Sequence, residues 1–403
     1  MTSEARPGNR SAAPDGAVLG ALAELPCEAL EPSLRFYCDG LGFRIDEIGP
    51  ADDPSVAELS GHGLRLRLVL GGRGPAGVLR VLSADPQGLC ARLMAAYGVR
   101  AAGADAGADA GADAGADAGA DATIGVLAPN GTVVVLARAD LPLVMPPVRQ
   151  SRVVSRISDA DAWHVGRAGM LYRDLIPDRQ GGRFIASHIR IPQGGPVPDW
   201  VHYHKIRFQM IYCCRGWVRV VYEDQGEPFL MQAGDCVLQP PEIRHRVLES
   251  GAGLEVVELG CPARHRTLAD HELSLPTGRL RPTREFGGQR FVWHRAEAAS
   301  WGPWRLPGFE VRDFGFGQAT GGIARAGVIR RAGTLAPGSH RHRAELCMLF
   351  VLRGSLGVRL GTEQPLELRP GDCCTVPSGL DYAIEAASVD LECLEVMLPA
   401  DAG

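Results

Sequence analysis

Four residues in the middle of the chain have the types and spacing of a metal-binding set. His202 and His204 are separated by one residue, Gln209 follows after four more, and His245 comes later. Side chains two positions apart on a strand point to the same face, so the first two imidazoles can reach one ion. Imidazole nitrogens suit first-row transition metals, and an amide oxygen can complete the set. The pattern therefore predicts one divalent metal held by His202, His204, Gln209 and His245.

The geometry of this set requires a break in the strand. Five positions separate His204 from Gln209, and this odd number would turn the glutamine to the opposite face of a straight strand. A turn or a bulge must therefore lie between them. His245 follows the rigid sequence Gln239-Pro240-Pro241, which can bring it in from another strand.

The neutral glutamine indicates which ligand such a site would prefer. Three neutral imidazoles and a neutral amide leave the charge of a divalent ion uncompensated. We therefore expect a small anionic molecule at the metal, such as a carboxylate, an enolate or a catecholate. Arg207 has the strand parity of Gln209, and Arg190 lies on the preceding strand. Either guanidinium can bind a carboxylate, and a surface salt bridge is the alternative for both.

Ligand type alone does not decide the metal. Fe(II) is favoured for three imidazoles and an oxygen with open coordination positions, and manganese, nickel, copper and zinc remain alternatives. Six further histidines are expected to be ordinary surface or core residues: His62, His164, His188, His265, His271 and His294.

A comparable segment recurs about 138 residues later with part of the set missing. His340 and His342 repeat the histidine pair, Cys347 stands at the position of Gln209, and Tyr382 stands at that of the third histidine. Internal repetition on this scale indicates a duplicated fold. A second site of two histidines, a thiolate and Glu345 is conceivable, but the sequence favours a degenerate copy that packs against the first.

Both copies resemble the cupin superfamily over about 250 residues. The resemblance rests on the spacing of Gly195, His202, His204, Gln209 and Gly216, and then of Gly234, Pro240 and His245. It implies a mainly β bicupin, with two double-stranded β-helix barrels and ligands that point inward. Two positions depart from the family pattern. Gln209 replaces the usual glutamate, and Glu242 replaces the glycine of the Pro-x-Gly turn.

The segment from Val18 to about Ala139 is predicted to be a separate α+β unit. Helices are expected over 32–43 and 86–97. Strands are expected over 43–48, 56–59, 64–70, 78–82, 123–127 and 132–136. Asn130-Gly131 predicts a hairpin between the last two strands.

This unit resembles the vicinal oxygen chelate, or glyoxalase-like, superfamily over roughly 120 residues. The matching residues are Ser33-Leu34-Arg35-Phe36-Tyr37, Leu41-Gly42-Phe43 and Ala128-Pro129-Asn130-Gly131-Thr132. The resemblance implies βαβββ modules. The family's metal positions fall near Leu22, Leu66, Val78 and Val135, and apolar side chains cannot hold a cation. A structural role is favoured for this domain, with ligand binding or dimerisation as alternatives.

The predicted organisation has four parts. They are a disordered tail over 1–16, a glyoxalase-like domain over 17–145, a first cupin domain with the metal site over 150–275, and a second, degenerate one over 285–400. A Gly-Ala-Asp-Ala repeat forms a low-complexity loop at 101–122. Its aspartates recur every four residues, but the tract lacks the oxygen-rich loops that calcium requires, so we expect a solvated loop.

Composition excludes several classes of partner. The net charge is −5 and the pI is about 6.1, which does not favour nucleic-acid or anionic-membrane binding. The chain lacks an apolar run long enough to span a membrane and an apolar signal-peptide core near its start. The eleven cysteines form no repeated CxxC pair, which is typical of reduced thiols in a cytoplasmic protein. A homodimer is expected only by analogy with the two families.

Two kinds of function follow from this pattern. The first is a non-haem metal-dependent oxidoreductase, a mononuclear iron dioxygenase acting on a small anionic or aromatic metabolite. The same site can also support isomerase, decarboxylase or lyase chemistry. The second is a non-catalytic bicupin that binds or senses a small molecule. A metal-independent cyclase or epimerase is a third alternative, and it would survive chelation.

Overall fold

The computed structural model describes residues 18, 20–102, 124–139, 142–159, 163–166, 169–335 and 338–400. The chain divides into two compact units, Met1–Pro142 and Leu143–Gly403, and each is described by itself. The predicted tail over 1–16 and nearly all of the predicted loop over 101–122 lie outside the described residues. The domain boundaries drawn from the sequence stay predictions.

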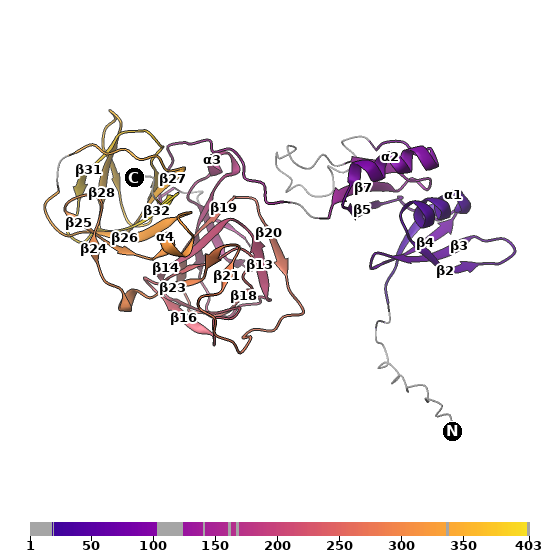
Figure 1. The fold of residues 1–403 in the computed structure, drawn as a ribbon, viewed down its shortest axis with the longest axis horizontal. Helices are drawn as coiled ribbons and strands as arrows, with labels where there is room; N and C mark the ends of the chain where they lie inside the picture. Colours follow the sequence, from indigo (N-terminus) through magenta and orange to yellow (C-terminus); the bar gives the residue numbers. More distant parts are fainter. Residues whose placement is uncertain are drawn as a thin grey trace, which may run out of the picture. The chain divides into compact units, whose positions relative to one another are not determined.

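The first unit contains two small sheets, each with a helical segment (Figure 1). In the first sheet the strand order is β1-β4-β3-β2, and in the second it is β5-β7-β6. Strand β1 runs parallel to β4, and β5 runs parallel to β7. The elements are β1 (Ala23–Cys27), α1 (Leu30–Arg35), η1 (Phe36–Gly40), β2 (Arg44–Gly49), β3 (Val56–Gly61), β4 (Leu64–Leu70), β5 (Val78–Ser83), α2 (Pro86–Tyr97), β6 (Ile124–Leu127) and β7 (Val133–Arg138).

Local sequence signals explain the ends of α2, which has the predicted bounds. The Asp85 carboxylate accepts a hydrogen bond from the Gly88 backbone N–H at 2.9 Å. Pro86 opens the helix, where a missing N–H costs nothing. Gly98 closes it with φ 63°, a left-handed conformation that glycine adopts without strain.

The predicted hairpin at Asn130-Gly131 is confirmed, because β6 and β7 pair antiparallel across it. The Asn130 side chain is buried, accepts a hydrogen bond from the Tyr37 hydroxyl at 3.2 Å and donates one to the Pro26 carbonyl at 3.1 Å. These bonds tie the two halves of the unit together. The first half has βαβββ connectivity, while membership of the glyoxalase-like family stays a prediction.

The second unit is built of strands arranged in two barrels (Figure 1). The first barrel has the elements β9 (Trp163–Val165), β10 (Leu171–Asp174), α3 (Arg179–Gly182), β11 (Ile185–Ile191), β12 (Gly195–Pro196), β13 (His202–Lys205), β14 (Phe208–Arg215), β15 (Trp217–Tyr222), β16 (Phe229–Gln232), β17 (Cys236–Leu238), β18 (His245–Ser250), β19 (Leu254–Cys261) and β20 (Arg266–Ala269).

A connecting segment and the second barrel follow. The connecting elements are β21 (Glu285–Phe286), β22 (Gln289–Arg290), β23 (Val292–His294) and η4 (Ala296–Ala298). The second barrel has β24 (Gly302–Pro303), β25 (Phe309–Asp313), α4 (Phe316–Ala319), β26 (Arg325–Arg331), β27 (Leu346–Arg353), β28 (Leu356–Leu360), β29 (Leu366–Leu368), β30 (Cys373–Thr375), β31 (Tyr382–Ala387) and β32 (Glu392–Leu398).

The large sheets of the two barrels repeat one another strand for strand. Each has seven strands, ordered β23-β17-β14-β19-β11-β10-β9 in the first barrel and β24-β25-β26-β32-β27-β30-β8 in the second, where β8 is Val154–Ser155. A smaller sheet faces each of them: β16-β15-β18-β13-β20 in the first barrel and β29-β28-β31 in the second. Even the register shift in β14, between Cys213 and Arg215, recurs in β27 between Val351 and Arg353. The duplication expected from the sequence repeat is therefore present in the fold.

The outer faces of the two seven-stranded sheets pack against each other. Phe208, Met210 and Tyr212 alternate along β14 and are buried in a core that also contains residues of the second barrel. Phe208 lies edge-on to Phe316 at 6.3 Å between ring centroids, and Tyr212 stacks on Phe314 at 5.9 Å. Because successive side chains alternate, Gln209 and Ile211 face the interior of the first barrel.

The barrels also exchange strands. Strand β8 (Val154–Ser155), which precedes the first barrel, pairs with β30 of the second. Strand β23, which precedes the second barrel, pairs with β17 of the first. The fully buried Arg173 reinforces this junction, because its guanidinium donates to the Ser155 hydroxyl at 3.1 Å and to the Gly371 carbonyl. Each seven-stranded sheet is therefore completed by chain that belongs to the other repeat.

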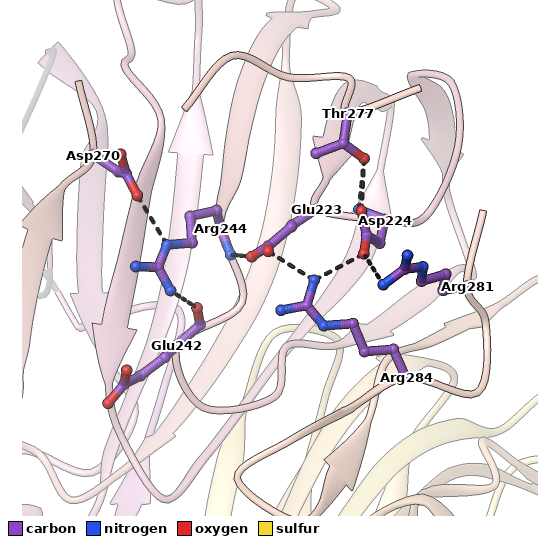
Figure 2. Close-up of polar contacts among 8 residues, drawn as sticks. All are labelled: Glu223, Asp224, Glu242, Arg244, Asp270, Thr277, Arg281 and Arg284. Carbon is purple, nitrogen blue, oxygen red and sulfur yellow. Dashed lines mark hydrogen bonds and ion pairs between the residues drawn. The ribbon is translucent and has the colours of Figure 1, made fainter. Parts of the chain in front are cut away.

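The segment between the barrels is fixed to the first barrel by a polar network (Figure 2). The Asp224 carboxylate accepts hydrogen bonds from the Thr277 hydroxyl and from Arg284, both at 2.8 Å. Arg284 also donates to Glu223 at 2.8 Å, and Arg281 lies 3.8 Å from Asp224. Glu223 and Asp224 directly follow β15, so the network holds the connecting segment against the end of that strand.

Across the described ranges, every helix is too short or too polar to cross a lipid bilayer.

We predict that Asp224→Asn weakens the fold at neutral pH but not in acid. Burial raises the pKa of Asp224, but the hydrogen bonds from Thr277 and Arg284 outweigh it and hold the pKa below its usual value. Stability from a lowered carboxyl pKa is fully present above the unfolded value, about 3.9, and is lost as the pH falls through the folded pKa. The variant should lose about 1–3 kcal/mol at pH 7, since hydrogen bonds to a charged group are removed.

The measurement is urea unfolding of both proteins at a series of pH values from neutral to acid. The difference in unfolding free energy between the two proteins should shrink once the pH falls below the pKa of the Asp224 carboxyl in the unfolded chain. Asp390→Asn is the matched control, because Asp390 is exposed and pairs with Arg353 on the surface. A difference that stays constant with pH would contradict the assigned role of the Asp224 carboxylate.

Candidate metal centre

Three histidines converge inside the first barrel. His202 and His204 lie on β13, and His245 opens β18, where it is the direct cross-strand partner of His202. Ligand atoms of all three lie within 4.8 Å of one another. In the part of the chain that the structure describes, this is the one group of three or more histidine, cysteine or acidic side chains close enough to hold an ion.

Hydrogen bonds at Nδ1 orient these imidazoles. The Nδ1 of His202 donates to the Trp200 carbonyl at 2.9 Å, and that of His245 donates to the Ile243 carbonyl at 3.0 Å. A carbonyl only accepts, so in both rings the proton is on Nδ1 and the lone pair is on Nε2. The Nδ1 of His204 is 2.8 Å from the Thr267 hydroxyl on the neighbouring strand β20. Nε2 is therefore the atom that each ring offers to a metal.

Asp199 adds a carboxylate behind the triad. One of its oxygens is 3.5 Å from Nδ1 of His202, and the other accepts the Val247 backbone N–H at 3.0 Å. Its side chain is only 4% exposed. A buried carboxylate beside a metal-binding imidazole is a common arrangement, because it raises the basicity of the ring.

Arg244 directly precedes His245 and contacts β13, the strand that carries the other two histidines. Its guanidinium lies 3.9 Å from the ring centre of Tyr203, the residue between His202 and His204. It donates to Asp270 at 3.0 Å and to the Glu242 carbonyl at 3.1 Å. Glu242 itself has φ 62°, a conformation that explains why the related pattern places glycine there.

Gln209 reaches the same cavity from the opposite sheet. The chain crosses between the two sheets at residues 206–207, where β13 ends and β14 begins, so the expected break between His204 and Gln209 is present. Gln209 is 2% exposed, and its Nε2 donates to Glu258 at 2.7 Å. Its Oε1 is buried and has no hydrogen-bond partner among the described residues. The bond to Glu258 thus fixes the amide of Gln209, and its oxygen still lacks a hydrogen-bond donor or a metal.

Glu258 is a site residue that the sequence reasoning missed. It lies on β19, diagonally across from Gln209, and lines the cavity. The expectation that nothing offsets the charge of a bound cation is wrong, because the Glu258 carboxylate lies next to the neutral amide of Gln209. A signal was present, since Leu254, Val256 and Glu258 alternate on β19 and place one acid on an otherwise apolar inward face.

The cavity has a volume of about 180 Å³ and is mostly apolar. At the metal end the Tyr222 ring stacks on His245 at 5.5 Å, and burial raises the pKa of its hydroxyl, which therefore stays a neutral donor. The lining residues are Met170, Tyr172, Ile189, Ile191, Val197, Pro198, Asp199, His202, His204, Gln209, Ile211, Val218, Val220, Tyr222, Met231, Gln239, His245, Arg246, Val247, Leu254, Val256 and Glu258.

The two arginines expected to bind an anionic substrate do not line this cavity. Arg190 alternates on β11 with the inward-facing Ile189 and Ile191, so its side chain lies outside the barrel. There it pairs with Glu255 at 3.3 Å and lies 4.2 Å from the ring centre of Trp163. Arg207 lies in the crossing between the sheets, where strand parity does not apply. Arg246 does contribute to the lining, but it alternates with the inward-facing His245 and Val247 on β18.

In the second barrel the His342 side chain is held by bonds to the backbone. The Nε2 of His342 donates to the Val376 carbonyl at 3.0 Å, and its Nδ1 accepts the Ala344 N–H at 3.1 Å, so neither nitrogen is available. The backbone of His340 pairs with that of Tyr382. Glu345, named from the sequence as a conceivable further ligand, does not face the interior. Instead, it pairs with Arg183 of the first barrel at 2.6 Å.

A polar network fills the interior around the remaining second-site residues. Arg305 donates to the Tyr382 hydroxyl and to Glu395, and Glu395 also accepts from the Trp304 indole at 3.0 Å. Burial raises the pKa of the Cys347 thiol, which favours its protonated form. In the second barrel these polar contacts occupy the interior that corresponds to the histidine triad of the first.

One further histidine lies beside the triad. The His265 ring is 5.3 Å from that of His204, and its Nδ1 donates to the Pro262 carbonyl at 3.1 Å. The expectation that His265 is an ordinary histidine overlooked this position, because it follows β19 on a loop that carries no motif.

Comparison with known proteins identifies one domain. A search of curated protein sequences finds no significant match to this chain. Among solved structures, salicylate 1,2-dioxygenase from Pseudaminobacter salicylatoxidans is 15% identical, with a TM-score of 0.47 over 64% of this chain and 87% of that chain. The oxalate decarboxylase of Lactobacillus farciminis is 14% identical, with a TM-score of 0.46 over 65% and 90%. Residues 329–397 match the family model described as Cupin domain. The chain therefore contains a cupin domain, which lies in its second barrel.

Proposed function

We propose that the first barrel is also a cupin and binds one divalent metal through His202, His204, His245 and Gln209. The observation that carries this proposal is the convergence of three imidazoles at one end of an enclosed cavity. The donor set fits a metal, because two of the rings have the tautomer that leaves Nε2 as the ligand atom. The buried Oε1 of Gln209, without a partner in the described ranges, supplies an oxygen. Fe(II) is favoured, with manganese, nickel, copper or zinc as alternatives.

The charges around the site favour a substrate with a single anionic group. A divalent ion brings two positive charges and Arg246 in the lining a third, while the carboxylates of Glu258 and Asp199 offset two of them. Neither Arg190 nor Arg207 reaches the cavity to hold a second anionic group. The walls are aliphatic, so the rest of the substrate is apolar or aromatic. We infer a small metabolite that binds the metal through an anionic oxygen and buries an apolar body.

The reaction that we propose is oxidation by dioxygen, as in a mononuclear non-haem dioxygenase. Bound iron would supply the activation of substrate and dioxygen. The chain's own residues orient the substrate and exclude water through the apolar walls. Tyr222 lines the cavity and stacks its ring on that of His245, so it helps to hold this imidazole in place. Isomerase, decarboxylase or lyase chemistry would use the same residues, and a non-catalytic sensor would bind the same kind of ligand.

The proposal also covers the first unit, the oligomeric state and the partners of the protein. We infer that the first unit is a glyoxalase-like domain with a structural role. Its βαβββ half supports this, and two of the expected ligand positions, Leu66 and Val135, are buried apolar side chains. A homodimer in the cytoplasm, with no nucleic-acid or membrane partner, completes the proposal.

We predict that His245→Ala abolishes stoichiometric metal binding, because it removes a direct ligand. The fall in affinity should exceed about 100-fold, since even residues behind the ligands contribute 10–100-fold. His340→Ala is the matched control, because His340 occupies the position of His202 in the second barrel, and it should leave the metal content unchanged. Elemental analysis of natively purified proteins gives the answer and identifies the metal. Full metal content in His245→Ala would refute the ligand assignment.

We expect oxygen consumption when protein loaded anaerobically with Fe(II) is mixed with a suitable small carboxylate, phenol or enol. An oxygen electrode and product analysis measure this across a panel of such compounds. His202→Ala serves as the inactive control. If no compound drives oxygen uptake and none is converted without oxygen, the binding or sensing function replaces catalysis. Full activity of metal-free protein would exclude any metal-dependent reaction.

We predict that Gln209→Glu is harmful alone and is repaired by Glu258→Gln. The single change places two carboxyl groups at the 2.7 Å separation of the present hydrogen bond, so one of them must take up a proton. Exchanging the two residues restores one amide and one carboxylate. Unfolding free energies of the two single variants and the double variant should be non-additive by about 1–3 kcal/mol. Additive changes in unfolding free energy would mean that the contact between residues 209 and 258 does not contribute to stability.

A further inference from the structure

A second buried glutamine in the cavity has an entirely unsatisfied amide. Gln239 is 1% exposed and lines the cavity. Both its Nε2 and its Oε1 are buried without a hydrogen-bond partner among the described residues. Burying an amide in this state is costly, because its hydrogen bonds to water are lost and nothing replaces them.

Two other buried glutamines near this cavity, Gln209 and Gln289, are each anchored through Nε2. Gln209 donates its Nε2 to Glu258 at 2.7 Å, and Gln289 donates its Nε2 to the Arg207 carbonyl at 2.6 Å. Both are 2% exposed, so they resemble Gln239 in burial. The Oε1 of all three lacks a partner among the described residues, and Gln239 differs from the other two because its Nε2 lacks one as well.

The backbone keeps Gln239 in this place. Its N–H donates to the Gln209 carbonyl at 2.9 Å, so the two glutamines are neighbours on the wall. Leu238 before it pairs with Met210 and points to the core between the barrels. Pro240 and Pro241 after it restrict the chain further. The side chain is thus held toward the cavity, where it presents one donor and one acceptor.

We propose that Gln239 is a specificity-determining residue that binds a hydroxyl group of the substrate. A hydroxyl can donate to Oε1 and accept from Nε2, so it satisfies both halves of the amide. This inference rests on the proposed function in that the same cavity takes the substrate. It narrows the substrate class to a small, mostly apolar compound with an anionic oxygen at the metal and a neutral hydroxyl at Gln239. A site built to bond a hydroxyl discriminates strongly against the analogue that lacks it.

Stability of the metal-free protein gives a test that does not depend on metal or activity. Gln239→Met keeps the side-chain volume and removes the unsatisfied amide, so the Tm should rise by about 2–4 °C. Gln289→Met is the matched control, and its Tm should fall because the Arg207 carbonyl loses its donor. Gln239→Leu is a second variant in case methionine packs poorly. A fall in Tm for both Gln239 variants would overturn the proposal, because the amide would then be bonded within the protein.

Binding gives the complementary test. The probes are benzoate and the three monohydroxybenzoates, titrated calorimetrically into zinc-loaded protein. At least one hydroxy probe should bind more than 10-fold tighter than benzoate to the wild type, and Gln239→Met should remove this preference while keeping the affinity for benzoate and the metal content. A preference that survives in Gln239→Met, or its absence from the wild type, would overturn the assignment of the hydroxyl. Wild-type protein that holds no zinc would refute the proposed metal function. The Tm comparison would still show whether the Gln239 amide is bonded within the protein.

Discussion

Strand β14 has to satisfy two interiors at once, and most of the site follows from this constraint. Phe208, Met210 and Tyr212 complete the core between the barrels, while Gln209 and Ile211 line the cavity. A shift by one residue would bury the amide between the barrels and expose aromatic rings to the cavity, so the register is fixed from both sides. The histidine pair is free of this constraint because β13 belongs to the opposite sheet. The candidate centre therefore forms where the chain crosses between sheets, with ligands supplied from both walls.

The two barrels show how one framework can hold either a cavity or a filled core. In the first barrel, two of the histidines use Nδ1 to hold backbone carbonyls and direct Nε2 inward. In the second, His342 commits both nitrogens to the backbone, and Arg305 brings Tyr382 and Glu395 together in the interior. A buried charge needs a partner to be tolerated. The second barrel provides that partner itself, whereas the first leaves amide atoms of Gln209 and Gln239 for something that enters from outside.

The sequence predicted the histidine triad because its spacing encodes two strands of a repeated motif, and the structure brings those side chains together. It also predicted the repeat, the hairpin at Asn130-Gly131 and the bounds of α2, since each of these depends on local chemistry. It did not predict Glu258, because that residue meets Gln209 only through pairing of strands distant in the chain. Arg190 forms the salt bridge that was the alternative to substrate binding, because the phase of β11 is set by Ile189 and Ile191, which the motif does not include. Gln239 was regarded only as part of a rigid connection, since an unsatisfied amide becomes visible only after every neighbour is placed.

The exchange of β8 and β23 between the repeats makes each barrel depend on the other. Strand β23 pairs with β17, which in turn pairs with β14, the strand that carries Gln209. Strand β8 pairs with β30 and so completes the large sheet of the second barrel. A deletion of either repeat would remove an edge from the surviving sheet, so the two repeats have to be inherited together.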